Sequence, residues 1–219
     1  MTGKLIMKKN VVFLVLMVTF AALAAPQMGT MTDSRDGKSY KTVKIGNQVW
    51  MAENLDFETK HSYCYDAEGE RYKKQPSCND KKFVSGRLYT YDAAKGACPS
   101  GWHLPTIAEF ETLIQSAGGK EKAGKRLKST TEWYSYDYWD DDEEENVTKD
   151  GNGSDDYGFS AKPVGYSHDE TYYGDLNKET YFWCVSEMED DCFNLGREEE
   201  AFLLQRCRNY QNSIRCIKD

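Results

Sequence analysis

The chain has 219 residues and is acidic, with 36 Asp and Glu against 28 Lys and Arg and a formal net charge of −8. Excess negative charge repels the phosphates of nucleic acids and of anionic membranes, so nucleic-acid binding is not expected. Tyr, with 15 copies, dominates the aromatic residues, which suits either the margins of a β-rich core or a recognition surface.

Residues 1–24 predict a signal peptide. Lys8 and Lys9 precede an apolar run over 11–20, and Ala22 and Ala24 supply the small residues of a cleavage site. The apolar run is too short to span a bilayer, so we expect no membrane insertion after the signal is removed. We therefore expect a protein that is secreted or held at the cell surface, with a linker over 25–31 and one domain over 32–219.

The first elements after the linker are predicted to be strands. Residues 40–45 are rich in β-formers, Gly46 and Asn47 signal a two-residue hairpin turn, and residues 48–51 continue as the return strand. A polar loop follows between Cys64 and Cys78. Apolar residues at helical spacing then predict a first helix over 87–96.

A second helix over 106–117 has the clearest signal. Thr106 and Glu109 have the spacing of a capping box after a proline. Four apolar residues at i, i+3, i+4 and i+7 form one face of this helix, and Gly118 and Gly119 end it: Phe110, Leu113, Ile114 and Ala117.

Residues 121–160 are polar and are predicted to form a loop. Beyond them, strand signals occur at 181–185, 201–204 and 213–217. Two helices near the middle and an antiparallel strand meander give the α+β class.

Several stretches, taken in order, carry a resemblance to a known family. They are TDSRDGKSY at 32–40, VKIGNQVWMAENL at 43–55, CYD at 64–66, GRLYTY at 86–91, CPSGWHLPT at 98–106, DYGFSA at 156–161 and RCIKD at 215–219. The chain is similar in these stretches to the Fibrobacter succinogenes major paralogous domain family. The resemblance implies a C-type-lectin-like fold stapled by disulfides, and it transfers no catalytic residues or ligand. Its association with exported proteins of fibre-degrading bacteria points to polysaccharide binding.

Seven cysteines lie beyond the predicted signal peptide, and export makes disulfides the default state. The resemblance implies a bond between Cys98 and Cys216, which would tie a helix to the final strand. Cys64 and Cys78 would close a polar loop, and Cys184 could face Cys207 across neighbouring strands. Cys192 would then have no disulfide partner within the chain. No cysteine pair has the short gap of a zinc knuckle, so no metal site is assigned.

The residues proposed to bind a ligand lie in one aromatic segment: Trp133, Tyr134, Tyr136, Tyr138 and Trp139. In an extended strand the three tyrosines would share one face and the two tryptophans the other. Aromatic rings beside carboxylates suit sugars, because the rings stack on C–H groups while the acids accept hydroxyl protons. Packing of these rings onto the core is the competing interpretation.

No cofactor is predicted except calcium, for which the acidic residues are candidate ligands. The tract over 140–145 is most simply a solvated loop, and Asp150, Asn152 and Ser154 have the spacing of half a calcium loop. However, Asp155 and Ala161 stand where that loop needs Gly and Glu, and the usual calcium triplet of lectins is absent.

Catalytic motifs of hydrolases, metalloproteases and phosphate-binding enzymes are absent from the sequence. We therefore expect a non-catalytic binding module, for plant-type polysaccharide. One alternative is a structural or protein-interaction domain whose odd cysteine bonds a partner chain. Another is a thiol enzyme similar to formylglycine-generating enzymes, with Cys207 activated by Arg206 and Arg208.

Overall fold

The computed structural model describes residues 25–72, 77–79, 84–142, 144–169, 172–187, 191–205, 207 and 209–219. The predicted signal peptide, residues 1–24, lies outside the described residues. Within the described ranges most of the regular secondary structure is strand, and there are three helices. All pairs of named strands there are antiparallel except β10 with β12.

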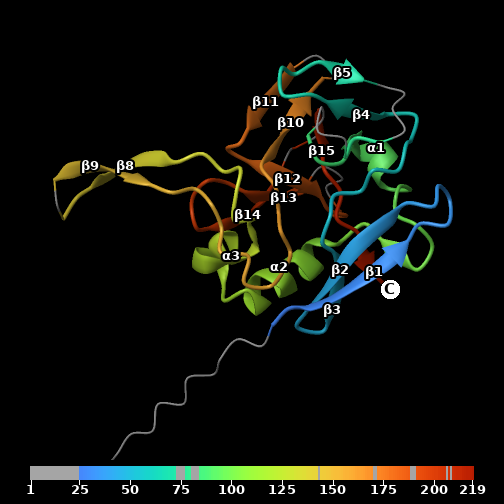
Figure 1. Ribbon diagram of the computed structural model, residues 1–219, viewed down its shortest axis with the longest axis horizontal. Coiled ribbons are helices and arrows are strands. Elements are labelled where there is room, and N and C mark those ends of the chain that lie inside the picture. The colour runs from blue at the N-terminus through green and yellow to red at the C-terminus, as the bar shows by residue number, and fades with distance from the viewer. Residues whose placement is uncertain are drawn as a thin grey trace, which may run out of the picture.

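The first sheet joins the two ends of the described chain (Figure 1). Its order is β1 (Gln27–Thr32), β2 (Ser39–Ile45), β3 (Gln48–Met51), β16 (Ile217–Lys218) and β7 (Trp102–His103). The predicted hairpin of β2 and β3 is confirmed, with Gly46 at φ 58° in its turn.

The predicted linker over 25–31 is instead largely strand β1, which pairs along its whole length with β2. This strand is mostly exposed and has no apolar face, so hydrophobic patterning could not reveal it. Its position is set by backbone hydrogen bonding to the edge of β2.

The second sheet has the order β14, β13, β12, β10, β15, β6, β4, β5, with β11 added beside β10. The bounds of these strands are β4 (Ser62–Tyr65), β5 (Arg71–Tyr72), β6 (Leu88–Thr90), β10 (Val164–His168), β11 (Tyr172–Leu176), β12 (Thr180–Trp183), β13 (Cys192–Leu195), β14 (Ala201–Leu204) and β15 (Tyr210–Asn212).

The helices agree with the sequence to different degrees. Helix α2 (Ile107–Ser116) has the expected capping box: Thr106 Oγ1 accepts from the Glu109 amide at 3.2 Å, and Glu109 Oε2 accepts from the Thr106 amide at 2.8 Å. Its four predicted apolar residues are all buried. Helix α1 (Tyr91–Ala94) is shorter than predicted, because the residues before it form β6 and pair with β15 and β4.

Helix α3 (Lys120–Leu127) forms where the sequence predicts a polar loop. Charged residues on its outer side hide a short apolar stripe of Ala123, Gly124 and Leu127, all buried. The helix packs against α2 and β14, and Figure 1 shows α2 and α3 side by side.

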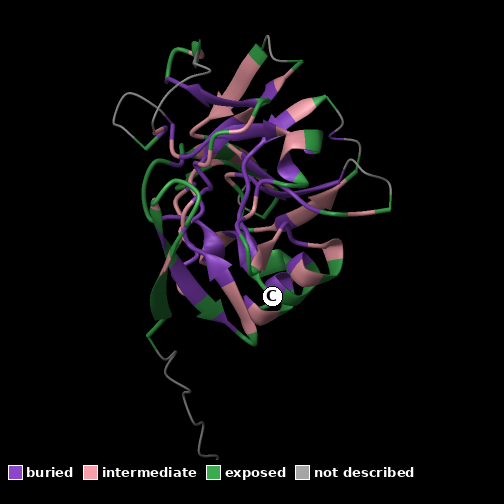
Figure 2. Cartoon of the chain, turned by 90° about the vertical axis from the view of Figure 1, so that its right-hand side faces the viewer, coloured by how far each residue is buried: buried purple, intermediate pink, exposed green. Residues whose placement is uncertain are grey.

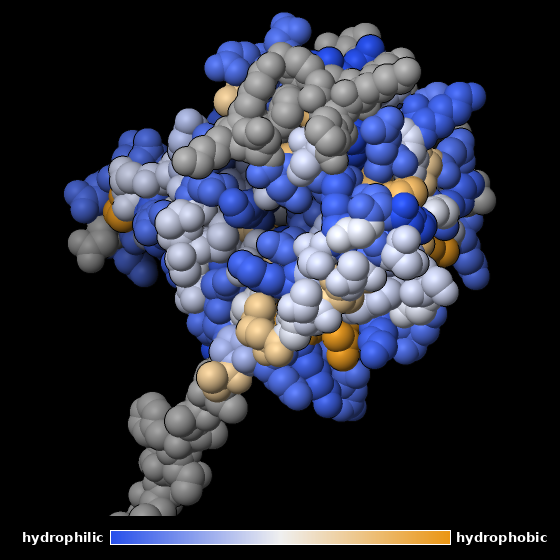
Figure 3. Space-filling view, turned by 45° about the vertical axis from the view of Figure 1, so that its right-hand side comes forward, coloured by the Kyte–Doolittle hydropathy of each residue, from blue (hydrophilic) through white to orange (hydrophobic). Residues whose placement is uncertain are grey.

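The core is rich in aromatic contacts and lies at the centre of the body (Figure 2). Trp50 packs on Phe110 with 5.1 Å between ring centroids, and Phe110 stacks on Phe193 at 4.6 Å. A second cluster surrounds Trp183, whose indole Nε1 donates to the Tyr89 carbonyl oxygen at 2.6 Å. Most surface residues on the face shown in Figure 3 are hydrophilic.

Three disulfides staple this fold. The predicted Cys64–Cys78 and Cys98–Cys216 bonds are confirmed. The predicted Cys184–Cys207 bond is wrong, because Cys207 bonds Cys192 and leaves Cys184 as a buried free thiol. Side chains alternate along a strand, so Cys184 points into the cluster around Phe182 and Phe193. Cys192 and Cys207 instead lie together in the cluster around Trp183.

None of the helices in the described ranges has both the length and the apolar composition that a bilayer span requires. The three disulfides are typical of proteins that fold in an oxidising compartment outside the cytosol.

Candidate functional site

The predicted aromatic segment forms much of a two-stranded hairpin that projects from the body (Figure 1). Strand β8 (Tyr136–Asp140) pairs antiparallel with β9 (Glu145–Lys149). The sequence predicts a loop here, since the many acidic residues hide the alternation of the strands. The paired backbone instead holds the side chains in two opposed faces.

Trp133 does not lie on either face, although the sequence places it with the ligand-binding residues. Its side chain is only 3% exposed, and its indole Nε1 donates to Ser129 Oγ at 3.1 Å and to the Ala161 carbonyl oxygen at 3.2 Å. Its backbone amide donates to Asn152 Oδ1 at 3.0 Å. Trp133 therefore anchors the hairpin to the core.

The residues with calcium-loop spacing also stabilise the base of the hairpin. Asp150 Oδ1 accepts from the backbone amide of Asn152 at 3.0 Å and from its Nδ2 at 2.8 Å. Ser154 Oγ donates to the Lys125 carbonyl oxygen at 3.3 Å. These contacts account for the polar side chains of the segment without an ion, and calcium binding stays a prediction.

The first hairpin face carries Tyr136 and Tyr138, and cations cover their rings. The Arg197 guanidinium lies 5.7 Å from the Tyr136 centroid, and Lys149 Nζ lies 4.2 Å from that of Tyr138. The Tyr138 hydroxyl donates to Asp140 Oδ2 at 3.0 Å. A ligand would have to displace these cations before it could stack on the ring faces that they cover.

The second hairpin face carries Trp139, which is 56% exposed. Asp137 shares this face because it lies two residues away, and Asn146 and Thr148 lie directly opposite on β9. Thr148 Oγ1 donates to Asp137 Oδ1 at 2.6 Å. The open indole is therefore bordered by a carboxylate, an amide and a hydroxyl group. Tyr134, just before β8, is equally exposed.

A polar cavity of about 520 Å³ lies in the body, and no residue of β8 or β9 lines it. No motif of the sequence indicates this cavity, because its lining comes from residues far apart in the chain: Met28, Ser39, Lys41, Ala52, Glu53, Asn54, Asn79, Ser85, Ser129, Thr130, Asp155, Ser160, Lys162 and Arg215. Arg215 lies in its wall with a side chain only 1% exposed.

Two lining residues of this cavity have an unusual backbone. Asp155 and Ser160 adopt φ of 49° and 51°, in the left-handed region that residues other than glycine seldom occupy. Asp155 Oδ1 accepts from the Ser160 amide at 2.8 Å, and Asp155 Oδ2 accepts from the Ser160 hydroxyl. Burial raises the pKa of the Asp155 carboxyl above its ordinary value. Such strained residues cluster at functional sites.

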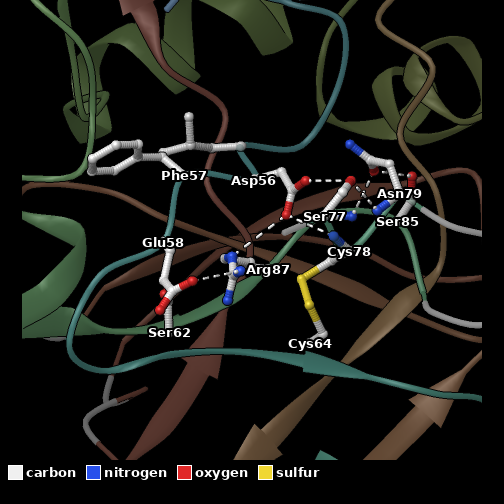
Figure 4. The surroundings of a disulfide bond; sticks show 12 residues. Asp56, Phe57, Glu58, Ser62, Cys64, Ser77, Cys78, Asn79, Ser85 and Arg87 are labelled. Atoms are coloured by element: carbon white, nitrogen blue, oxygen red, sulfur yellow. Dashed lines mark hydrogen bonds and ion pairs between the residues drawn. A yellow bond between two sulfur atoms is a disulfide. The ribbon is translucent and has the colours of Figure 1, made fainter. Parts of the chain in front are cut away.

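A third group of polar side chains surrounds the Cys64–Cys78 disulfide (Figure 4). Asp56 and the two sulfur atoms lie close enough together to resemble a metal site, but the sulfur atoms are bonded to each other. Asp56 accepts from Ser77 Oγ at 2.8 Å and from the Cys78 amide at 2.9 Å, and lies 3.5 Å from the buried Arg87. These contacts support a structural role.

The thiols do not support the proposed thiol enzyme. Cys207, its suggested nucleophile, is bonded to Cys192. Cys184 is fully buried, and desolvation, followed by the charge of Asp191, raises its pKa to about 12. A thiol in that environment is neither exposed nor ionised at neutral pH. The burial of Cys184 also argues against its bonding a partner chain.

Comparison with known proteins identifies a family but no individual related protein. The model of the Fibrobacter succinogenes major domain matches residues 43–218. Searches of the curated proteins and of the solved structures found no match. Because the matched range covers well over half of the sequence, the chain belongs to the Fibrobacter succinogenes major domain family.

Proposed function

We propose that the protein is an exported, non-catalytic binding module of C-type-lectin-like architecture, which holds plant-type polysaccharide on the Trp139 face of its hairpin. The architecture is supported by the Cys98–Cys216 bond, which ties the segment after α1 to the residue before the last strand. Export is supported by the three disulfides and the predicted signal peptide.

The exposed indole of Trp139 is the observation that carries the proposal. A tryptophan that is 56% exposed on a projecting hairpin leaves apolar surface in water that a sugar ring can cover. Asp137, Asn146 and Thr148 share its face and supply acceptors and donors for sugar hydroxyls. Because both strands are extended, the face is a shallow strip along which a polysaccharide chain can lie.

The proposal is tested by binding of the oxidised protein to a panel of soluble and insoluble plant polysaccharides, in calcium and in chelator. Trp139→Ala should weaken binding at least about tenfold, because buried tryptophans at interfaces contribute more than most contacts. Tyr172→Ala is the matched control, because Tyr172 is 57% exposed but lies on β11 rather than on the hairpin.

Two results would contradict this function. One is the absence of saturable binding to every polysaccharide in the panel by a folded protein. The other is binding that Trp139→Ala and Tyr172→Ala weaken equally. Loss of binding in chelator alone would show that calcium takes part.

A further inference from the structure

We propose that the 520 Å³ cavity is a second binding site, which takes a polyhydroxylated carboxylate the size of one sugar ring, such as a uronate. The proposal rests on a buried, unpaired cation in the wall of a cavity whose other lining residues are mostly polar or charged. It does not depend on the hairpin, because no residue of β8 or β9 lines this cavity.

Arg215 is the buried cation. Its guanidinium makes four hydrogen bonds, all to neutral oxygens: Nε to Asn54 Oδ1 at 2.6 Å, Nη1 to the carbonyl oxygens of Met51 and Phe159 at 3.2 and 2.6 Å, and Nη2 to that of Ser160 at 3.1 Å. A guanidinium has five N–H groups, so one on Nη2 has no acceptor among the described residues.

The charge of Arg215 is also unpaired. It makes no ion pair with any carboxylate in the described ranges, although Glu53 and Asp155 line the same cavity. Burying a cation without a counter-ion is costly, and an anionic ligand in the cavity would remove that cost. The rings of Phe159 and Phe182 lie 4.8 and 5.5 Å from the guanidinium carbon and hold the group in place.

Two lysines at the cavity add positive charge. Lys41 is exposed on β2 and makes no ion pair with a described residue, whereas Lys162 Nζ lies 3.1 Å from Glu132 Oε1. Lys41 is therefore the lysine of this cavity that is left to pair with a bound carboxylate. Three cationic side chains line the cavity against two carboxylates, within a protein whose overall net charge is −8, so the site attracts an anionic group.

The two carboxylates of the cavity select the kind of anion. Glu53 Oε2 accepts from the Lys41 amide at 2.7 Å, and Asp155 is held by Ser160, so both keep fixed positions. They would repel a phosphate, whose charge is spread over all its oxygens, whereas a uronate can turn its uncharged hydroxyls toward them and its carboxylate toward the cations. Their remaining lone pairs accept from ligand hydroxyls, as Asn54, Asn79 and the serine hydroxyls around them also can.

The size of the cavity fits a small ligand. A volume of about 520 Å³ lies within the range of roughly 300 to 1,000 Å³ that small-molecule sites occupy. The ligand can be a free sugar acid or a uronate residue of a polysaccharide, since the carboxylate and hydroxyls are the same in both.

The test is calorimetric titration of the mature, disulfide-bonded protein at low ionic strength with galacturonate, galactose and inorganic phosphate. We expect saturable binding of galacturonate, with galactose and phosphate each at least about tenfold weaker, and an affinity that falls with added salt. Titration with oligogalacturonides distinguishes the sources: binding as tight as that of the monomer identifies a polymer residue, and exclusion identifies a free acid.

The variants compare two lysines of one strand. Lys41→Gln should weaken galacturonate binding about tenfold, and Lys44→Gln, also exposed on β2 but outside the cavity lining, should leave it unchanged. Arg215→Gln should abolish binding, but it also removes structural hydrogen bonds, so Lys41→Gln is the decisive change. Trp139→Ala should have no effect here, which separates this site from the hairpin.

Three results would overturn the proposal. They are the absence of saturable galacturonate binding, galactose or phosphate binding as tightly as galacturonate, and equal effects of Lys41→Gln and Lys44→Gln. Each can occur whether or not the hairpin binds polysaccharide.

Discussion

His103 joins two segments that are far apart in the sequence. Its Nδ1 lies 2.7 Å from Asp219 Oδ1 and its Nε2 lies 2.9 Å from Glu109 Oε1. Partial burial alone would lower its pKa, but the hydrogen bonds and charges of the two carboxylates outweigh that effect and raise it above 6.5. These contacts give His103 a structural role, because they link the first turn of α2 to Asp219.

The raised pKa predicts how stability depends on pH. A group whose pKa is higher in the folded state stabilises the fold fully below its unfolded pKa of about 6.5. That contribution is lost as pH rises through the higher folded pKa. We therefore expect the free energy of unfolding, measured in urea, to fall as pH rises above about 6.5.

Two variants test the origin of this pH dependence. His103→Gln should flatten the slope of stability against pH in this range, and Asp219→Asn should flatten it in part, since Glu109 remains. A slope that is unchanged in His103→Gln would show that another group is responsible.

Gly124 shows how α3 depends on its neighbour. A Cβ atom at this position would overlap the backbone carbonyl oxygens of Glu199 and Glu200, just before β14. The next residue along the helix, Lys125, donates its amide to the Glu199 carbonyl oxygen at 3.0 Å. Backbone thus packs directly on backbone, which only glycine allows here.

Gly124→Ala should therefore destabilise the protein, although the same change in an unhindered helix stabilises it by about 1 kcal/mol. Gly96→Ala is the control, because nothing lies within 4 Å of a Cβ there and its φ is not positive. Thermal unfolding of both variants measures the effect. A melting temperature that rises in Gly124→Ala would show that the two segments can separate.

Some of these elements can be predicted from the local sequence and others cannot. Helix α2 is predictable because its cap and its apolar face lie within twelve consecutive residues. Helix α3 and the β8–β9 hairpin are not predictable from the sequence, because their many charged residues mask the periodic apolar pattern of a helix or a strand. The sequence singles out the aromatic segment as the candidate site, but only the structure separates buried Trp133 from exposed Trp139.

At the scale of the whole molecule, sequence signals become weaker still. The cavity brings together Lys41, Asp155 and Arg215, which are far apart in the chain and belong to no common motif. The Cys192–Cys207 bond depends on which face of β13 turns inward, and the sequence could not decide that register. The Cys98–Cys216 bond is predictable, because the export signal favours disulfides and the family resemblance implies this pair.

The Cys98–Cys216 bond closes a loop with a sequence separation of 118, longer than either other disulfide. In the chain-entropy model so long a loop contributes about 4 to 5 kcal/mol to stability. Cys98→Ala and Cys216→Ala should each lose that amount in non-reducing urea unfolding, since either change breaks the same bond. The double variant should lose little more.

Cys184→Ala is the control for additivity. Cys184 and Cys98 lie in different core clusters, so the losses of Cys184→Ala and Cys98→Ala should add when the two changes are combined. If Cys98→Ala and Cys216→Ala were equally additive, the two cysteines would contribute independently, and the bond could not be what holds the final strand against the body. If only Cys98→Ala and Cys216→Ala are non-additive, the disulfide between them stabilises the fold. The connection between residue 98 and the segment before β16 is then one of the main determinants of stability.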